Sequence, residues 1–252
     1  MTIHQITFSP TGGTRRASEF LCKGFDAEST ITELCTQEEN LNYPNIKADD
    51  LVVISMPVYA GRVPALATER LKNVISNGAK CVIIAVYGNR AYEDALVEMQ
   101  DVATEMGFQV IAAITAIAEH SICSMYATGR PDAIDAKELA SFGTTILEKI
   151  KENKPFAPLT LLGNRPYKQG CTGPFPTANN NCTDCGTCAS QCPTGAISLD
   201  NPKGNNNELC IGCMRCVSVC PVHARGIGER LNMLAERLKP LCSDRKHNEL
   251  FV

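Results

Sequence analysis

Short apolar runs alternate with amphipathic stretches through the first part of the chain. Strands are predicted where β-branched and apolar residues run together, and helices where apolar residues recur every three or four positions. The predicted strands are 2–8, 51–56, 81–86 and 109–115, with a weaker one near 30–34, and the predicted helices are 14–25, 64–77, 92–106 and 133–152. Because strand and helix alternate, we predict an α/β doubly wound parallel sheet with helices on both faces.

The pattern changes after residue 152, where Pro and Gly punctuate the chain at close intervals. Such a composition is typical of a linker that packs without a core of its own. We therefore predict a first domain at 1–152, a linker at 153–175 and a smaller second domain at 176–252. The second domain is expected to contain a helix at 229–238, stopped by Pro240, and to end in polar surface residues.

The second domain carries one cysteine pattern twice. C-x2-C-x2-C-x3-C-P begins at Cys182 and again at Cys210. This is the spacing of bacterial two-cluster ferredoxins, in which the fourth cysteine of each repeat ligates the other cluster. Zinc sites or disulfides are the alternatives, but zinc gives no reason for the third cysteine and the proline of each copy. The predicted ligands are Cys182, Cys185, Cys188 and Cys220 for one [4Fe–4S] cluster, and Cys210, Cys213, Cys216 and Cys192 for the other.

Three loops of the first domain are predicted to meet at the carboxyl edge of the sheet, where doubly wound proteins bind ligands. The first loop offers hydroxyls and backbone N–H groups at a helix N-terminus, which suits a phosphate. It has no Lys and no Walker pattern, so a nucleoside triphosphate with Mg²⁺ is disfavoured. The other two loops bring tyrosines that could enclose a planar ring, unless these are ordinary surface tyrosines. The candidate binding residues are Ser9, Thr11, Gly12, Gly13 and Thr14 in the first loop, Pro57, Val58, Tyr59, Ala60, Gly61 and Arg62 in the second, and Tyr87, Gly88, Asn89, Arg90 and Tyr92 in the third.

Residues 1–150 resemble the flavodoxins. The first loop is similar to the T-x-T-G-x-T phosphate loop of that family, and residues 88–93 look like its third loop. The resemblance implies strand order 2-1-3-4-5, bound FMN with its phosphate on Thr11 to Thr14, and Tyr92 against one face of the ring. Tyr59 stands near the place where flavodoxins often carry a Trp. The whole chain resembles the flavodoxin–ferredoxin fusion proteins of anaerobic bacteria and archaea.

Several residues depart from the family pattern or stand outside it. Asn89 replaces a typical Asp, and Arg62 and Arg90 lie on the flavin loops, so we predict a reduced anionic flavin stabilised by positive charge. The alternative is that both arginines face solvent or pair with local acids. The loop 116–132 carries His120, a candidate proton donor to a substrate over the flavin or else an exposed histidine.

The remaining cysteines fit no metal-binding spacing. Cys22 and Cys81 are predicted to be small core residues. No role is assigned to Cys35, Cys123, Cys171 and Cys242.

The composition of the 252 residues bounds the class of protein. With 44% hydrophobic and 20% charged residues, a packed core is expected. The net charge of −3 and the lack of a basic stripe argue against nucleic-acid binding. Neither a signal peptide nor a membrane span is recognised, so we expect a cytoplasmic, reduced protein from an anaerobe or a low-oxygen compartment.

The sequence therefore predicts electron transfer between two [4Fe–4S] clusters and FMN. A flavin-dependent reductase of a small organic substrate, fed by the clusters, is one alternative. A redox-sensing interaction protein is another. The redox protein partner or small-molecule substrate is unidentified, and a homodimer is an open possibility because a second subunit could shorten the flavin-to-cluster path.

Overall fold

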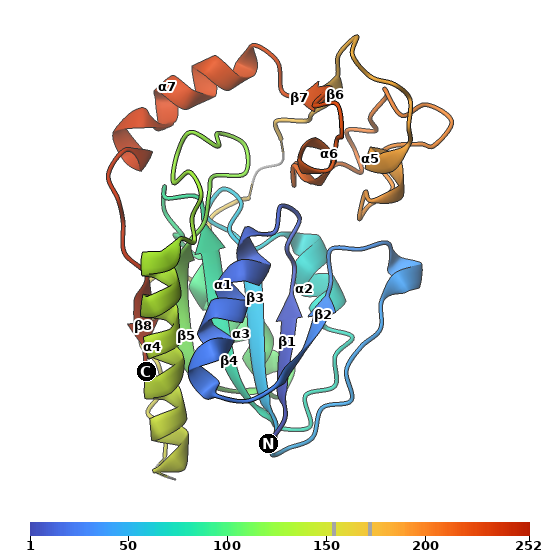
Figure 1. The fold of residues 1–252 in the computed structure, drawn as a ribbon. Coiled ribbons are helices and arrows are strands. Elements are labelled where there is room, and N and C mark those ends of the chain that lie inside the picture. Colours follow the sequence, from blue (N-terminus) through green and yellow to red (C-terminus); the bar gives the residue numbers. More distant parts are fainter. Residues whose placement is uncertain (153–154, 171–172) are drawn as a thin grey trace.

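A mostly parallel six-stranded sheet forms the first part of the computed structural model, which describes residues 1–152, 155–170 and 173–252. Its strand order is β2-β1-β3-β4-β5-β8 (Figure 1). The first five strands run parallel in the predicted order 2-1-3-4-5, which confirms the doubly wound fold. The strands are β1 (Ile3–Thr7), β2 (Ser29–Glu33), β3 (Leu51–Pro57), β4 (Lys80–Tyr87), β5 (Gln109–Ile117) and β8 (Glu249–Phe251).

Helices cover both faces of this sheet because the central strands are apolar on both sides. On β3, Val52 and Ile54 pack toward α2 (Ala65–Leu71) and α3 (Ala95–Glu105). Leu51 and Val53 pack toward α1 (Gly13–Cys22) and α4 (Ala133–Lys151) on the opposite face. Each of the four strand side chains is at most 1% exposed. Burial of each stabilises the fold by roughly 1.5–3 kcal/mol.

Two helix ends differ from the sequence prediction. Helix α2 ends at Leu71 rather than at residue 77, because Asn73 and Val74 donate to carbonyls three residues back and the chain continues in turns. Helix α7 (Arg230–Cys242) does not stop before Pro240 but contains it in its last turn. Within the described ranges, the structure has no helix with the length and apolar character needed to cross a bilayer.

The cysteine-rich segment lies beyond the carboxyl ends of the parallel strands (Figure 1). A two-stranded ladder, β6 (Thr177–Ala178) with β7 (Arg225–Gly226), joins its start to its end. Two single-turn helices, α5 (Thr187–Ser190) and α6 (Arg215–Ser218), pack against each other and represent the two copies of the sequence repeat. After β7 the chain runs through α7 back toward the sheet.

The end of the chain leaves the second domain and adds a strand to the sheet of the first. Strand β8 pairs antiparallel with β5, with Thr115 opposite Glu249 and Ala113 opposite Phe251. The last residues of the predicted domain 176–252 therefore belong to the sheet of the first domain. An unpaired β5 would expose a row of backbone N–H and C=O groups, and β8 covers it.

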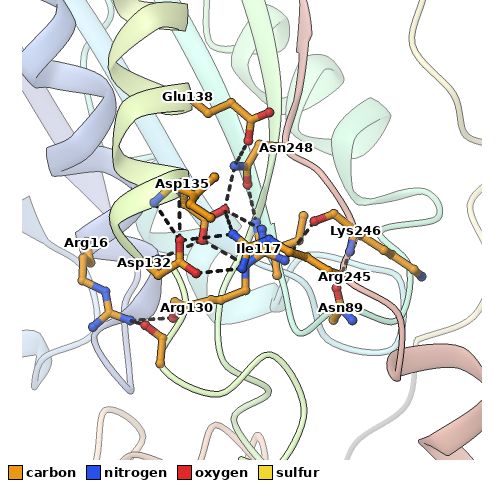
Figure 2. Close-up of polar contacts among 12 residues, drawn as sticks. Arg16, Asn89, Ile117, Arg130, Asp132, Asp135, Glu138, Arg245, Lys246 and Asn248 are labelled. Atoms are coloured by element: carbon orange, nitrogen blue, oxygen red, sulfur yellow. Dashed lines mark hydrogen bonds and ion pairs between the residues drawn. The ribbon is translucent and has the colours of Figure 1, made fainter.

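A buried polar network holds this C-terminal segment against the sheet (Figure 2). Arg130 and Asp135, whose side chains are 4% and 0% exposed, form an ion pair through two hydrogen bonds. Asn248 accepts a hydrogen bond from the backbone N–H of Ile117 at 2.9 Å and donates to Asp135 at 3.0 Å. The last residues are thus bonded both to β5 and to the first turn of α4.

Replacing Asp135 by Asn should lower the free energy of unfolding by about 3–5 kcal/mol, because it leaves the buried Arg130 without a counter-charge. Burial alone would raise the pKa of Asp135, but the hydrogen bonds from Arg130 and its neighbours hold it below the ordinary value. The stabilisation is therefore present above about pH 4 and is lost as the pH falls further. Denaturant unfolding of D135N and of the parent as a function of pH measures both effects.

The matched control is E19Q, which removes the exposed Arg15–Glu19 pair on α1. An exposed pair of this kind contributes about 0.5 kcal/mol or less. Equal losses in D135N and E19Q would contradict the assigned role of the buried pair.

Candidate functional site

A cavity of about 700 Å³ opens beside the first loop. Thr11, Gly12, Gly13 and Arg16 line it from the first domain. Gly12 takes a left-handed conformation (φ 88°) directly before α1. Among the described residues, no hydrogen-bond acceptor faces the backbone N–H groups of Gly12, Gly13 and Thr14. These N–H groups at the start of a helix are suited to an anion.

Ser9 and Thr14 are buried behind the cavity wall, 3% and 5% exposed. The Ser9 hydroxyl accepts a hydrogen bond from the backbone N–H of Arg15 at 2.9 Å, so it shapes the loop from inside. Gly13 is required by close approach, since a Cβ there would lie 2.8 Å from the Cβ of Ala118 at the end of β5. The first loop therefore fits closely against the last parallel strand.

A second, narrower cavity of about 110 Å³ lies between the other two loops. Residues predicted for a ring site line it from both sides: Val58, Tyr59, Ala60 and Gly61 from the second loop, and Tyr87, Gly88 and Arg90 from the third. Pro57 ends β3 just before the second loop. Ser121 and Ile122 belong to the walls of both cavities, so the two cavities adjoin each other along the carboxyl edge of the sheet.

Besides Pro57, three predicted binding residues of these two loops do not line the second cavity. Arg62 forms hydrogen bonds of 2.7 and 2.8 Å with Glu98, so of the two loop arginines only Arg90 borders the cavity. Tyr92 packs edge-to-face against Tyr87, with ring centroids 5.7 Å apart, and faces a different depression. Asn89 donates to the backbone carbonyls of residues 242 and 244, both at 2.7 Å, and so anchors the C-terminal segment.

His120 forms part of the roof of the second cavity. Its ring lies over Gly88, where an added Cβ would come within 2.8 Å of it. Burial, with the charge of Arg90, lowers the pKa of His120 below its ordinary value. Its Nδ1 accepts from the backbone N–H groups of Ile122 and Cys123 at 3.3 and 3.2 Å, which leaves the ring proton on Nε2. The sequence indicated His120 as a candidate proton donor, and the structure places its ring at the second cavity.

The second repeat forms one wall of the same cavity. Ile211 and Gly212 line it together with the loops that carry the tyrosines. Tyr59 is half-buried. Burial of its hydroxyl raises its pKa well above the ordinary value, and the nearby thiols of Cys213 and Cys35 add to the rise. No pattern in the sequence indicated this contact, because it joins segments about 150 residues apart in the chain.

One predicted ligand set surrounds a single small cavity of about 20 Å³. Its walls include the four cysteines expected to share a cluster, Cys192, Cys210, Cys213 and Cys216. Cys192 comes from the first repeat and the other three from the second, as the exchanged assignment expects. Among the described residues, no three His, Cys, Asp or Glu side chains converge closely enough to share a single metal ion.

The other predicted set lies farther out. Cys182 is half-buried and Cys185 is exposed, whereas Cys188 and Cys220 are buried. Burial would raise the pKa of the Cys220 thiol, but hydrogen bonds from backbone N–H groups, led by that of Ala224, hold this pKa below its ordinary value. The nearby Cys185 thiol raises the pKa of Cys220. Cys185 and Cys220, from different repeats, are therefore neighbours.

Three buried or half-buried arginines hold the cysteine-rich segment in place: two connect it to the first domain, and the third connects parts of the segment itself. Arg70 of α2 donates to the carbonyl of Pro193 at 2.8 Å. Arg215 donates to the carbonyl of Pro10 in the first loop at 3.0 Å. Arg225 lies between the two ligand sets: it donates to the Cys188 thiol at 3.8 Å. Burial raises the pKa of the Cys216 thiol to about 11, and the charge of Arg225 acts against that rise.

The cysteines without a predicted role have separate places. Cys22 and Cys81 are buried in the core, as predicted. Cys35 is buried near Cys213, and Cys123 and Cys242 share a small apolar cluster between the loop 116–132 and α7. Cys171 lies outside the described residues.

Residues 181–224 match a family described as 4Fe-4S dicluster domain. A search of curated proteins finds no match. Solved structures similar to the chain include a flavodoxin from the domain Archaea (16% identity, TM-score 0.45, 60% of this chain and 99% of that one) and Megasphaera elsdenii flavodoxin (16%, 0.42, 58% and 98%). Flavodoxin 2 from Bacillus cereus is similar at 16% identity and a TM-score of 0.41, over 59% of this chain and 99% of that one.

The strand order of the sheet and the family match together define the architecture. The chain joins a flavodoxin-like domain to a ferredoxin-type iron–sulfur domain, as the resemblance implied.

Double variants test the exchange of the fourth ligand. C192S/C213S removes two cysteines from one predicted set, so the other cluster should survive and about half the iron of the parent should remain. C185S/C192S removes one cysteine from each set and should lose most of the iron. Iron and sulfide are measured per chain after anaerobic purification.

The control is C123A, whose thiol belongs to neither set and which should keep the iron of the parent. If C185S/C192S kept half of the iron and C192S/C213S lost nearly all of it, each repeat would hold its own cluster with its own four cysteines.

Proposed function

We propose that the protein transfers electrons between an external redox partner and FMN through two [4Fe–4S] clusters. The observation that carries this proposal is the shared wall of the second cavity: Ile211 and Gly212 of the second cysteine repeat lie beside Tyr59 and Tyr87. A group held in that cavity lies against the loop that connects Cys210 to Cys213. Electron exchange then needs no movement of either domain.

The residues along the sheet edge fit FMN. The free N–H groups of Gly12 and Gly13 and the guanidinium of Arg16 suit the phosphate, and the tyrosine-lined cavity suits the ring. The second cavity alone is smaller than the roughly 300–1,000 Å³ of most ligand pockets, but it adjoins the larger one, with which it shares Ser121 and Ile122 as lining residues. FMN supplies the conversion between one-electron and two-electron steps when bound.

The exposure of the cysteines supports an order for the redox groups. The set that contains Cys185 reaches the surface, whereas in the other set Cys192, Cys213 and Cys216 are buried, Cys210 is half-buried, and the neighbouring Ile211 and Gly212 line the tyrosine cavity. The cluster on the exposed set would therefore exchange electrons with the partner, and the buried one with the flavin. The proposed order of partner, exposed cluster, buried cluster and flavin is the same for either direction of electron flow.

Cofactor analysis of protein purified without oxygen tests the proposal directly. We expect about eight irons per chain, with one FMN and with clusters and flavin that reduce in sequence on stepwise addition of dithionite. Eight irons with no flavin, and none taken up when FMN is added, would remove FMN from the proposal.

A matched pair of variants at Gly12 links the flavin to the first loop. An added Cβ at this position meets no atom within 4 Å, and Asn and Asp are the side chains that best tolerate its positive φ. G12D places a carboxylate at the phosphate end, so we expect FMN to bind at least about tenfold more weakly than in G12N. Fluorescence titration of the flavin-free proteins measures both affinities, and equal affinities would place the phosphate elsewhere.

A reductase that acts on a small organic substrate is the second candidate, and His120 is the observation that favours it. Its ring borders the second cavity and keeps a proton on Nε2, the arrangement of a hydrogen-bond or proton donor to a bound substrate. If the protein is such a reductase, H120Q should lose turnover at least tenfold while flavin content and cluster potentials stay unchanged. Unchanged turnover in H120Q would eliminate His120 from this function.

A further inference from the structure

The core of the iron–sulfur domain contains a permanent positive charge. Arg225 is 4% exposed, and a guanidinium keeps its proton under all conditions in which proteins fold. Its Nη1 donates to the carbonyl of Pro202 at 2.6 Å, and its Nη2 donates to the carbonyls of Pro176 and Gly204 at 3.3 and 3.5 Å. The buried Nε has no hydrogen-bond partner among the described residues.

In the described part of the molecule, no carboxylate pairs with this charge. None of the ion pairs in the described parts of the chain includes Arg225, whereas the buried Arg130 pairs with Asp135 and Arg62 pairs with Glu98. Backbone carbonyls satisfy donors but carry no net charge. Burial of an uncompensated charge is costly, so a negative group close to Arg225 is expected.

Among the residues that the structure describes, the anionic candidates in contact with Arg225 are cysteine sulfurs of both ligand sets. Nη1 donates to Cys188 of the outer set at 3.8 Å, and the guanidinium charge also acts on Cys216 of the inner set. The strand that carries Arg225, β7, begins five residues after Cys220 and pairs with β6 before Cys182. The guanidinium therefore sits where the two repeats meet.

We propose that Arg225 is the shared counter-charge of the two iron–sulfur clusters and raises the reduction potential of both. The inference rests on the proposed function, because it requires both clusters. Reduction adds one electron, and so one negative charge, to a cluster that is already anionic. A fixed positive charge stabilises the reduced form more than the oxidised form, and low exposure keeps water from screening it.

Redox titration of anaerobic protein, followed by electron paramagnetic resonance, tests the proposal with three variants. R225Q removes the charge and keeps hydrogen-bond donors. R225K keeps the charge and loses the planar fork. K203Q is the matched control: Lys203 pairs with Asp184 and its charge acts on Cys182, but its side chain is 53% exposed.

In R225Q, we expect the reduction equilibrium of each cluster to shift toward the oxidised form by at least about tenfold, which is 59 mV for a one-electron couple. R225K should stay within about threefold of the parent, and K203Q should shift only the outer cluster, by less than R225Q does. An R225Q protein with all of its iron and potentials no lower than those of K203Q would overturn the proposal.

The iron content of the variants distinguishes the remaining outcomes. If R225Q loses iron while R225K retains it with the potentials of the parent, positive charge is needed to hold the clusters, in agreement with the proposal. Loss of iron in both variants would make Arg225 a structural tie between carbonyls and overturn it. A parent protein with fewer than about eight irons would instead contradict the two-cluster function itself.

Discussion

The return of the chain to β5 is the constraint on which the rest of the molecule depends. Because β8 pairs with β5, the cysteine-rich segment is tied to the first domain at both of its ends. Asn248 and the Arg130–Asp135 pair fix that return from inside the protein. A segment attached by a linker alone would sample many positions, whereas this one is confined to the carboxyl edge of the sheet.

That edge is where a parallel sheet already gathers its functional loops. The loops after β1, β3 and β4 open there, and the long loop after β5 covers them with His120 and Ile122. Since the second repeat is confined to the same edge, Ile211 and Gly212 become part of the ligand cavity rather than a separate surface. The distance between this cavity and the cysteine repeats is thus determined by packing, not by diffusion of a tethered domain.

Hydrogen bonds from buried and half-buried arginines hold the cysteine-rich segment at this edge. Arg70 and Arg215 each reach from one domain to a backbone carbonyl of the other, and Arg225 connects three carbonyls within the cysteine-rich segment. A guanidinium suits this role because its rigid fork offers several donors at once. Loops built around metal clusters have few regular hydrogen bonds, so side-chain donors satisfy carbonyls that a helix or sheet would satisfy elsewhere.

The local sequence pattern was enough to predict the parallel sheet and to recognise the cysteine repeats. Apolar runs on both faces specify buried parallel strands, and even the weak strand near Thr30 is present as β2. The end of α2, the position of Pro240 inside α7 and strand β8 were not predicted. Strand β8 depends on a partner far away in the chain, β5, whereas α2 ends in local turns. Asn248 reads as an ordinary polar residue until Ile117 and Asp135 are beside it.

The sequence by itself determined the two modules and the cysteine repeats, since these follow from residue type and local spacing, and the flavodoxin resemblance implied the strand order that the sheet has. Only the tertiary structure decided which of the predicted ring residues share a cavity. In the structure, Arg62 pairs with Glu98 and Asn89 donates a hydrogen bond to the C-terminal segment. Gly212 lines the same cavity as Tyr59. The physical reason is that side-chain direction and contacts between distant segments depend on how the whole chain packs, which local spacing does not encode.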